Sequence, residues 1–339
     1  MMAPTGPTGP VGYGCDGIAY LVFNEDNVAG FWDPNAIGTG IDNAFGYTLP
    51  FEPVAVAVDP ALERSYFMDT GGSIAIVSTR EGLVNIVRPF VSSSSVVYAA
   101  VNPVNHQLIL SYPDSNMIAK VNGYTGEPIT EIDFQNPGPI AVDPFTNRIL
   151  IAERVSDSGF SSITALDGTS LGSYNTFDLE NSVITIADMA YDQCRDILFI
   201  ASSDGSAVAL QNTRSGQMES PAFVTVLDLS HSTAVAVDPV MQKAFFNEPN
   251  NSIISVDTCT LSPLDSTQRD PFANVVKLAV DERSHLLYAL TDAHRIDIFG
   301  TDLHPMWSIS NAARTQLIAV SVCRSYYCGY CYRIPPNFA

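Results

Sequence analysis

Short apolar runs recur along the chain, each separated from the next by a few polar residues. In six places an apolar run ends in Asp or Asn, three to five polar residues follow, and a second apolar run begins. The first of these units reads VAVAVDP at 54–60 and continues into the apolar run YFM at 66–68. Short runs of this kind, rich in β-branched residues and bounded by turn residues, predict β-strands, and no ten-residue stretch has a helical period.

The Asp or Asn that ends each first run, called the anchor below, returns at a nearly constant interval. The anchors are Asp59, Asn102, Asp143, Asp192, Asp238 and Asp281, so successive anchors lie 43, 41, 49, 46 and 43 residues apart. A period of about 40–45 residues is that of a four-stranded propeller blade. An Asp or Asn side chain can accept a backbone N–H in a tight turn, and a following proline presets φ. We therefore expect the anchors in equivalent turns between strands A and B of each blade, on one face.

The same step predicts a seventh A strand at 317–322, after which too few residues remain for a full blade. The start of the chain supplies strands B, C and D at 17–23, 28–32 and 41–49. The sequence thus predicts an all-β fold, a seven-bladed β-propeller with four-stranded blades, closed by a composite blade from both ends. We expect a flexible collagen-like segment at 1–16, containing GPTGPVG at 6–12, the propeller at 17–322, and a Cys/Tyr-rich tail at 323–339.

The unit of an apolar run, Ala-Val-Asp-Pro and a second apolar run resembles the repeats of YVTN and NHL-type propellers. The AVDP sequence stands at 57–60, 141–144 and 236–239, and the resemblance covers 17–322. The fourth unit departs from it with DQC at 192–194, and the long neighbouring intervals predict insertions around 213–221. Propellers of this kind serve as enzymes, receptors, scaffolds and adhesins, so the resemblance implies a fold and leaves the function open.

The charge balance excludes two classes of partner. Thirty-six acidic and 16 basic side chains give a formal net charge of −20, which repels the phosphates of nucleic acids and anionic lipid head groups. No segment reaches the roughly 18 apolar residues that span a bilayer. We therefore expect a soluble globular protein without nucleic-acid binding and without membrane insertion.

Motifs of catalysis or cofactor binding occur only in unsuitable places. A G-x-G-x-x-G match at 12–17 leads into a strand, and a G-x-S-x-G match at 168–172 falls in a predicted C–D hairpin, so we expect neither a dinucleotide site nor a nucleophilic serine. Five histidines, of which His106 and His285 occupy corresponding turns, lack the spacing of zinc ligands and are expected to be solvated. We predict no catalytic residue and no cofactor, although carboxylates from different blades could meet around a metal in the central channel.

The cysteines point to the closure of the ring. Cys15 directly precedes the first strand, and Cys323, Cys328 and Cys331 directly follow the last one. These four residues are candidates for a disulfide between the two ends, with a four-thiolate zinc site or free thiols as alternatives. Cys194 and Cys259 lie in separate predicted blades, and we expect buried free thiols there.

These observations favour a noncatalytic structural or binding propeller that contacts other proteins or glycans, as part of a larger assembly. Gly-Pro-Thr tracts like that at the start occur in spore-surface proteins and in structural proteins of large DNA viruses. We therefore expect an extracellular location or the surface of a particle, a virion or a spore. One alternative is an enzyme, a metal-dependent lactonase or lyase or a quinone-type oxidoreductase, with its site in the channel. The other is a cytoplasmic scaffold with reduced cysteines.

Overall fold

The chain is described from a computed structural model. The described residues are 19–23, 28–32, 45–59, 61–78, 81–89, 98–154, 161–179, 185–204, 206–214, 223–249, 251–267, 273–282, 284–293, 295–310 and 315–320. They form an all-β propeller of four-stranded antiparallel sheets.

Six complete blades are each built from four consecutive strands. Blade 1 comprises β4 (Ala55–Asp59), β5 (Arg64–Met68), β6 (Ile74–Ser78) and β7 (Gly82–Val87), and blade 2 comprises β8 (Tyr98–Asn102), β9 (Gln107–Tyr112), β10 (Met117–Asn122) and β11 (Pro128–Asp133). Blade 3 comprises β12 (Pro137–Asp143), β13 (Arg148–Arg154), β14 (Ser161–Asp167) and β15 (Ser173–Asp178), and blade 4 comprises β16 (Ile186–Asp192), β17 (Ile197–Ser202), β18 (Ser206–Gln211) and β19 (Phe223–Ser230). Blade 5 comprises β20 (Val235–Asp238), β21 (Lys243–Asn247), β22 (Ile253–Asp257) and β23 (Pro263–Thr267), and blade 6 comprises β24 (Val275–Asp281), β25 (Leu286–Thr291), β26 (Arg295–Gly300) and β27 (Pro305–Ser310).

A further four-stranded sheet combines the two ends of the chain. Its order is β28 (Thr315–Val320), β1 (Ala19–Phe23), β2 (Val28–Trp32) and β3 (Phe45–Thr48). Strand β28 pairs antiparallel with β1, so that Ala19 lies opposite Val320 and Leu21 opposite Ile318. The two ends of the chain are therefore hydrogen-bonded to each other within one sheet.

The expectation of seven equivalent blades needs a correction. Six blades are complete, and the structure describes the packing of their side chains, whereas the sheet that contains β28 is described almost entirely by its backbone pairing. The packed repeat is thus established for six blades. Strand β28 begins two residues earlier than expected, and β3 ends at Thr48, one residue before its predicted end.

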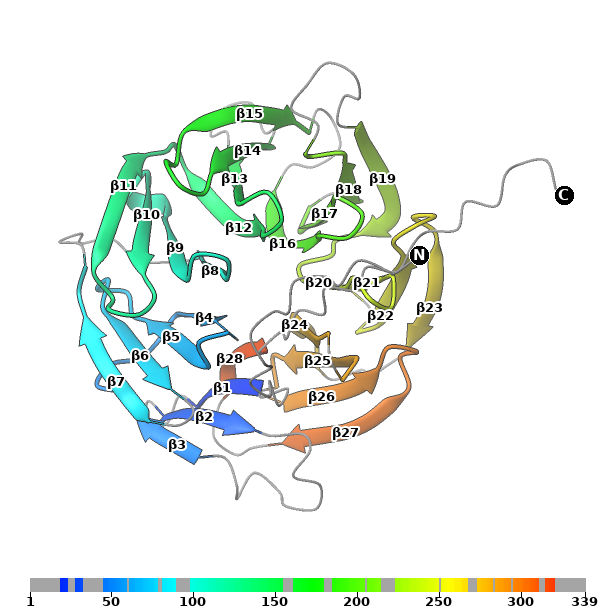
Figure 1. Cartoon of the computed structure of the whole chain (residues 1–339). Helices are drawn as coiled ribbons and strands as arrows, with labels where there is room; N and C mark the ends of the chain where they lie inside the picture. The colour runs from blue at the N-terminus through cyan, green and yellow to red at the C-terminus, as the bar shows by residue number, and fades with distance from the viewer. Residues whose placement is uncertain are drawn as a thin grey trace, which may run out of the picture.

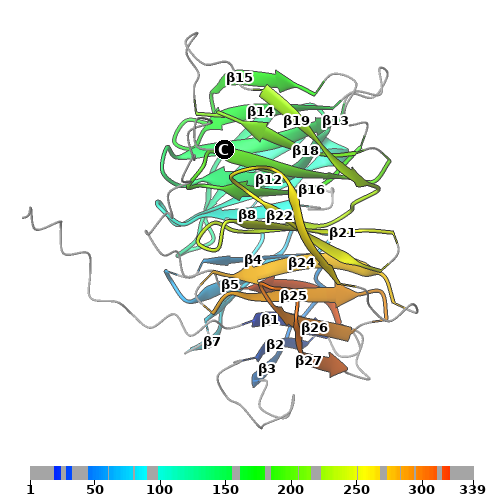
Figure 2. The ribbon, with the colours of Figure 1, turned by 90° about the vertical axis from the view of Figure 1, so that its right-hand side faces the viewer.

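The sheets stand around a common centre (Figure 1). Strands β4, β8, β12, β16, β20, β24 and β28 lie nearest the centre, and the last strand of each sheet lies at the rim. Figure 2 shows the ring from its side, with the strands running across its thickness. The 3₁₀-helix η2 (Pro113–Ser115) is the one helix among the described residues, and no helix found there is long and apolar enough to cross a membrane.

The middle strands are buried on both faces because each sheet packs between two others. All residues of β6, β17 and β25 are buried, although successive side chains of a strand point to opposite faces. The outer strands differ: β7, β11 and β23 are largely exposed. This explains why the middle strands read as continuous apolar runs, and why the outer strands carry a weaker signal.

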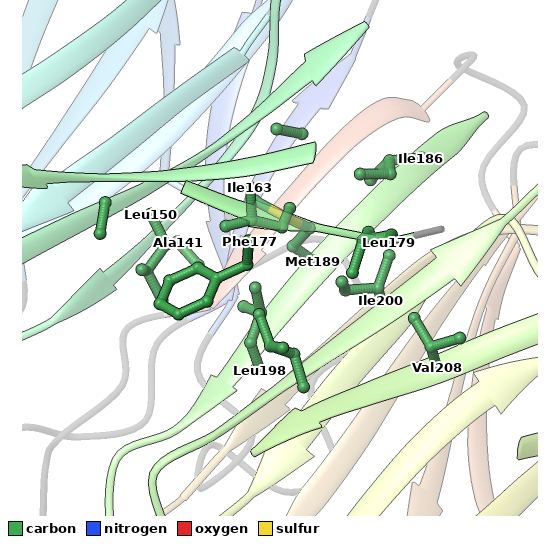
Figure 3. Packing of buried hydrophobic residues seen from close by; sticks show 13 residues of the cluster. Ala141, Leu150, Ile163, Phe177, Leu179, Ile186, Met189, Leu198, Ile200 and Val208 are labelled. Atoms are coloured by element: carbon green, nitrogen blue, oxygen red, sulfur yellow. The ribbon is translucent and has the colours of Figure 1, made fainter. Parts of the chain in front are cut away.

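The hydrophobic core is divided among the contacts between neighbouring blades. The cluster of Figure 3 joins blade 3 to blade 4: Ile163 and Phe177 come from blade 3, and Met189 and Leu198 come from blade 4. Corresponding clusters join blades 1 and 2, 2 and 3, 4 and 5, and 5 and 6. Each blade therefore depends on its neighbours for burial.

The turns between strands B and C bind the residues that directly precede the A strand of the same blade. Asp204 Oδ1 accepts the backbone N–H of Thr185 at 2.9 Å, and Asp292 Oδ1 accepts that of Asn274 at 2.9 Å. In blade 5 Asn247 Oδ1 accepts the N–H of Ala234 at 2.8 Å. These bonds fix the face of the ring opposite the anchors.

A close backbone approach in blade 3 gives a test of the turn geometry. A Cβ added to Gly168 would lie 2.6 Å from the carbonyl oxygen of Asn147, to which the Gly168 N–H donates. We expect Gly168→Ala to lower the free energy of unfolding by about 1–3 kcal/mol, because the backbone of Asn147 cannot move away without breaking that bond. Chemical denaturation measures the change.

The matched control is Gly71→Ala in the B–C turn of blade 1, where an added Cβ meets only the Asp69 side chain, at 3.4 Å. We expect this variant to keep wild-type stability or to gain slightly, because alanine restricts the unfolded chain. Equal destabilisation by both substitutions would contradict the specific role of Gly168.

Candidate functional site

The anchors occupy the turn that joins strands A and B in each of the six complete blades. In five of these blades the anchor Oδ1 accepts backbone N–H groups two or three residues ahead, as in Asp59 with Ala61 at 3.0 Å and Asp238 with Met241 at 2.9 Å. The same bond is made by Asn102 with Val104, Asp143 with Phe145 and Asp192 with Cys194. All six anchors are fully buried. The face that carries these turns and the C–D turns is called the anchor face below.

The residue four positions after each anchor has a left-handed backbone. Glu63, His106, Asn147, Asp196, Gln242 and His285 have φ between 52° and 59°. Asn, Asp and His tolerate this conformation better than most residues, because their short polar side chains bond locally. The sharp turn directs the side chain of this residue toward the preceding blade at three junctions.

Two histidines use this position to pair with a buried carboxylate of the preceding blade. His106 Nδ1 lies 2.8 Å from Asp59 Oδ2, and His285 Nδ1 lies 2.8 Å from Asp238 Oδ2. In blade 3 Asn147 Oδ1 accepts a hydrogen bond from the Asn102 amide of blade 2. For these two histidines the prediction of a merely solvated side chain was therefore wrong, whereas His231 and His304 are exposed as expected. Both His–Asp pairs have a sequence separation of 47 residues, a repeated offset that could have revealed them.

At the junction of blades 3 and 4 an arginine holds the anchor. Arg214 donates from Nε to Asp143 Oδ2 at 2.7 Å and from Nη2 to Asp143 Oδ1 at 2.8 Å. Burial opposes ionisation of Asp143, but the hydrogen bonds from Arg214, Thr146 and the Phe145 N–H, together with the charge of Arg214, hold the pKa of Asp143 below its usual value. Burial lowers the pKa of Arg214, but its hydrogen bonds with Asp143 and the nearby charges of Asp143 and Asp196 together raise this pKa above its usual value.

Basic side chains reach from one blade into the C–D turn of the next. Arg64 donates to the carbonyl oxygen of Tyr124 at 2.7 Å, and Lys243 donates to that of Thr301 at 2.7 Å. Lys120, which is buried, donates to the carbonyl oxygens of Gly168 and Thr169. Arg148 binds the carbonyl oxygens of Thr213 and Arg214.

Burial lowers the pKa of Lys120, and the nearby Asp167 counteracts this only in part. The lysine is nevertheless hydrogen-bonded to two carbonyl oxygens of the next blade. Arg195 and Arg214 act in the same way as Arg64, Lys120, Arg148 and Lys243. They join blades on the anchor face.

Large apolar side chains are exposed on the same face. Val104 and Phe145 follow their anchors by two residues and are 58% and 49% exposed, and Met241 follows by three and is 42% exposed. Tyr124, in the C–D turn of blade 2, is 49% exposed. The Arg64 guanidinium lies 5.7 Å from the Tyr124 ring centre, and that of Arg214 lies 5.2 Å from the Phe145 ring centre. The face thus offers apolar contact points on turns that the anchors hold rigidly.

A second polar group lies on the strands that surround the centre of the ring. Lys277 Nζ of β24 lies 2.9 Å from both carboxylate oxygens of Asp188 on β16. This ion pair connects blade 6 to blade 4, and the Val235 N–H of blade 5 also donates to Asp188 Oδ2. Three blades therefore meet at one carboxylate.

The structure assembles no metal centre from the residues it describes: no group of three His, Cys, Asp or Glu side chains there could hold a metal ion. The G-x-S-x-G match lies in the turn between β14 and β15, as the sequence predicted. Its Ser170 Oγ donates to Asp167 Oδ1 at 3.0 Å and accepts the Gly172 N–H at 3.2 Å. The hydroxyl serves its own turn and has no histidine partner among these bonds.

The cysteines of the predicted closure, Cys15, Cys323, Cys328 and Cys331, lie outside the described residues, as does the glycine motif at 12–17. The disulfide and the zinc site proposed for them stay predictions. Most of the predicted insertion at 213–221 also lies outside.

The remaining two cysteines correct an expectation. Cys194 and Cys259 are both disulfide-bonded, so the prediction of buried free thiols was wrong. It treated residues of different blades as distant from each other. The A–B turn of one blade in fact lies against the C–D turn of the next, as the Arg195 hydrogen bond to Cys259 Sγ at 3.2 Å shows for blades 4 and 5.

Comparison with known proteins supports the fold. No protein-family model matches the sequence, and no curated protein matches it. Among solved structures, hydrazine synthase of Kuenenia stuttgartiensis is similar with a TM-score of 0.64 and 10% identity, over 91% of this chain and 100% of that one. A functionally unknown protein from Desulfotomaculum acetoxidans DSM 771 has a TM-score of 0.66 and 14% identity, over 90% and 98% of the two chains.

The WD40 repeats of RRP9 are also similar, with a TM-score of 0.63 and 10% identity, over 77% of this chain and 82% of that one. At these identities the likeness extends to the fold alone. The chain is a β-propeller, and its neighbours include both a WD40 repeat protein and a protein named as an enzyme.

The Asp143–Arg214 pair yields a prediction about pH. We expect Arg214→Met to lower the free energy of unfolding at pH 7 by about 2–4 kcal/mol, because Asp143 becomes a buried carboxylate without its cation. Asp143 has a lowered pKa in the wild type, so its contribution is present above pH ~4 and is lost as the pH falls through that lowered value.

Without Arg214 the burial of Asp143 is no longer offset by the guanidinium, so the pKa of Asp143 rises and the group takes up a proton at a higher pH than in the wild type. The stability difference between the wild type and Arg214→Met should therefore be smaller at pH 4 than at pH 7, as measured by urea denaturation. The double variant Arg214→Met/Asp143→Asn should be more stable at pH 7 than Arg214→Met alone. A difference that grows toward pH 4 would overturn this account.

Proposed function

We propose that this chain is a noncatalytic β-propeller that binds other proteins through its anchor face, as part of an extracellular or particle-surface assembly such as that of a virion or spore. The observation that carries the proposal is the set of exposed apolar side chains on that face, Val104, Tyr124, Phe145 and Met241. Apolar and aromatic side chains held in fixed positions are the usual centres of binding energy in protein interfaces. The resemblance to YVTN and NHL-type repeats belongs to the same proposal.

The location is supported by the oxidation state of the cysteines. Cys194 and Cys259 are disulfide-bonded. Disulfides persist in oxidising settings such as the outside of cells and the surfaces of particles, whereas glutathione and thioredoxin keep cytosolic thiols reduced. This observation favours the extracellular or particle-surface location over a cytoplasmic scaffold.

Protein partners are preferred over glycans because of the chemistry of the exposed residues. Val104 and Met241 are aliphatic and widely separated in the ring, on blades 2 and 5. A protein surface can bury such separate apolar side chains simultaneously. The alternative of an enzyme would place its site in the channel, where the Lys277–Asp188 ion pair is the polar group that the structure describes.

The test compares two sites of charge insertion. The face variant is Val104→Asp/Met241→Asp, and the matched control is Leu264→Asp on the outer strand β23, where Leu264 is similarly exposed. Immobilised wild type is first used to find proteins from the source organism's medium or particles. Each candidate is then purified, and its Kd for the three forms is measured by calorimetry.

We expect the face variant to lose at least about tenfold in affinity and the control less than about twofold. A charge buried in the interface weakens the binding free energy by roughly 1.4 kcal/mol or more. Unchanged melting temperatures establish that both variants fold. A partner that binds all forms equally would refute the anchor face. Binding that is confined to a glycan array, or a stoichiometric metal or quinone in the purified protein, would replace the proposal by one of its alternatives.

The predicted closure by Cys15 has its own test, peptide mapping without reduction. Trypsin leaves Cys15 as the one cysteine of peptide 1–64, Cys323 in 315–324, and Cys328 and Cys331 in 325–333. We expect peptide 1–64 to be cross-linked to one of the two tail peptides, because β1 and β28 pair in one sheet and lead directly to these cysteines.

A disulfide across some 300 residues stabilises by roughly 5 kcal/mol in the chain-entropy model. Cys15→Ser should therefore lower the melting temperature in air, and reductant should remove the difference. One bound zinc per chain without a cross-link would favour the four-thiolate alternative. Alkylatable thiols at Cys15, Cys323, Cys328 and Cys331, with no bound zinc, would refute both the disulfide and the zinc site.

A further inference from the structure

The junction of blades 4 and 5 is built differently from its neighbours. In blades 1, 3 and 5 the B strand begins with a basic residue, Arg64, Arg148 or Lys243, which binds carbonyl oxygens in the C–D turn of the next blade. In blade 4 the corresponding residue is Ile197, which has no donor in its side chain. At this junction the basic side chain comes from the A–B turn instead, where Arg195 donates to the Pro239 carbonyl oxygen of blade 5.

Two bonded cysteines stand at the equivalent places. Cys194 follows the anchor Asp192 by two residues, and its N–H donates to Asp192 Oδ1 at 2.9 Å. Cys259 follows Asp257 by two residues in the C–D turn of blade 5, and its N–H donates to Asp257 Oδ1 at 2.8 Å. Each turn therefore fixes its cysteine by the same side-chain bond that shapes the other turns.

The neighbour of Cys194 shows how close the two turns lie. Arg195 donates from Nε to Cys259 Sγ at 3.2 Å and from Nη1 to the Pro239 carbonyl oxygen at 2.8 Å, both in blade 5. Cys194 and Cys259 are the cysteines that the described residues contain, and both are disulfide-bonded. The sulfur of Cys259 thus lies beside the residue that follows Cys194.

We infer that Cys194 and Cys259 are bonded to each other, so that one disulfide joins blade 4 to blade 5 on the anchor face. Its formation joins the two Sγ atoms while the two thiols release two protons and two electrons. An oxidant of the disulfide class, such as glutathione disulfide, takes these up and becomes two thiols. The bond adds a covalent link to the hydrogen bonds that Arg195 makes between the same two blades, and it makes this part of the ring dependent on an oxidising environment. The inference does not rest on the proposed function.

Peptide mapping of the full chain tests the pairing directly. Trypsin places Cys194 in peptide 155–195 and Cys259 in peptide 244–269, and each contains a single cysteine. After air oxidation and digestion without reductant, we expect one cross-linked species of these two peptides, which dithiothreitol separates. A cross-link from either peptide to 1–64, 315–324 or 325–333, or free thiols at both positions, would overturn the pairing.

Single and double variants provide a second readout. We expect Cys194→Ser and Cys259→Ser each to lower the melting temperature in air by about 5 °C or more, and the double variant to be no less stable than either single one, because all three lack the same bond. Dithiothreitol should bring the wild type down to the variants.

The matched control is Cys15→Ser, whose effect should add to that of Cys194→Ser, since the bond predicted for Cys15 is separate from the one inferred here. Additive losses for Cys194→Ser and Cys259→Ser would mean that the two residues have different partners. Equal melting temperatures for the wild type and all variants in air would show that the bond does not hold the two blades together.

Discussion

Each blade is packed between two others, and this constraint governs the rest of the structure. A four-stranded sheet with two apolar faces cannot bury both faces alone, so its middle strands, such as β17 and β25, become fully buried only when a neighbour covers each side. The described core clusters accordingly lie between blades. An arrangement of this kind favours a closed ring, since an open end would leave one apolar face in water.

The anchors extend the contacts between blades to the turns at one face of the ring. A buried carboxylate is tolerated only when its oxygens are occupied. In Asp59 and Asp238, Oδ1 accepts a backbone N–H of the same turn, and Oδ2 pairs with a histidine of the next blade. One side chain therefore both shapes a turn and sets its position against the next blade. The scarce basic residues reinforce the same junctions by binding turn carbonyls.

Local features of the fold could be predicted from the sequence because they depend on short stretches. The run of apolar residues, the anchor and the second run specify two strands and the turn between them, whatever the rest of the chain does. Contacts between blades could not be read in this way. The bonded state of Cys194 and Cys259 was missed because residues 65 positions apart in different blades were treated as distant.

Rim strands were the least predictable elements. Strand β3 ends at Thr48, one residue before its predicted end, because an outer strand has one exposed edge and little apolar pattern to define its ends. The candidate binding surface was not predicted at all. Val104, Phe145 and Met241 are apolar residues of turns, and only the ring places them on a common face.

The position two residues after the anchor shows how one backbone frame can serve several purposes. Its N–H is held by the anchor in five of the blades, yet the side chains there differ: Ala61, Val104, Phe145, Cys194 and Val240. The anchor binds the backbone N–H at this position, and that bond does not depend on which side chain the residue carries. At one junction it is a bonded cysteine, and at two others it is a large exposed apolar group. Surface chemistry can therefore change at these positions while the ring stays the same, which is the property expected of a scaffold whose function resides in what its turns present.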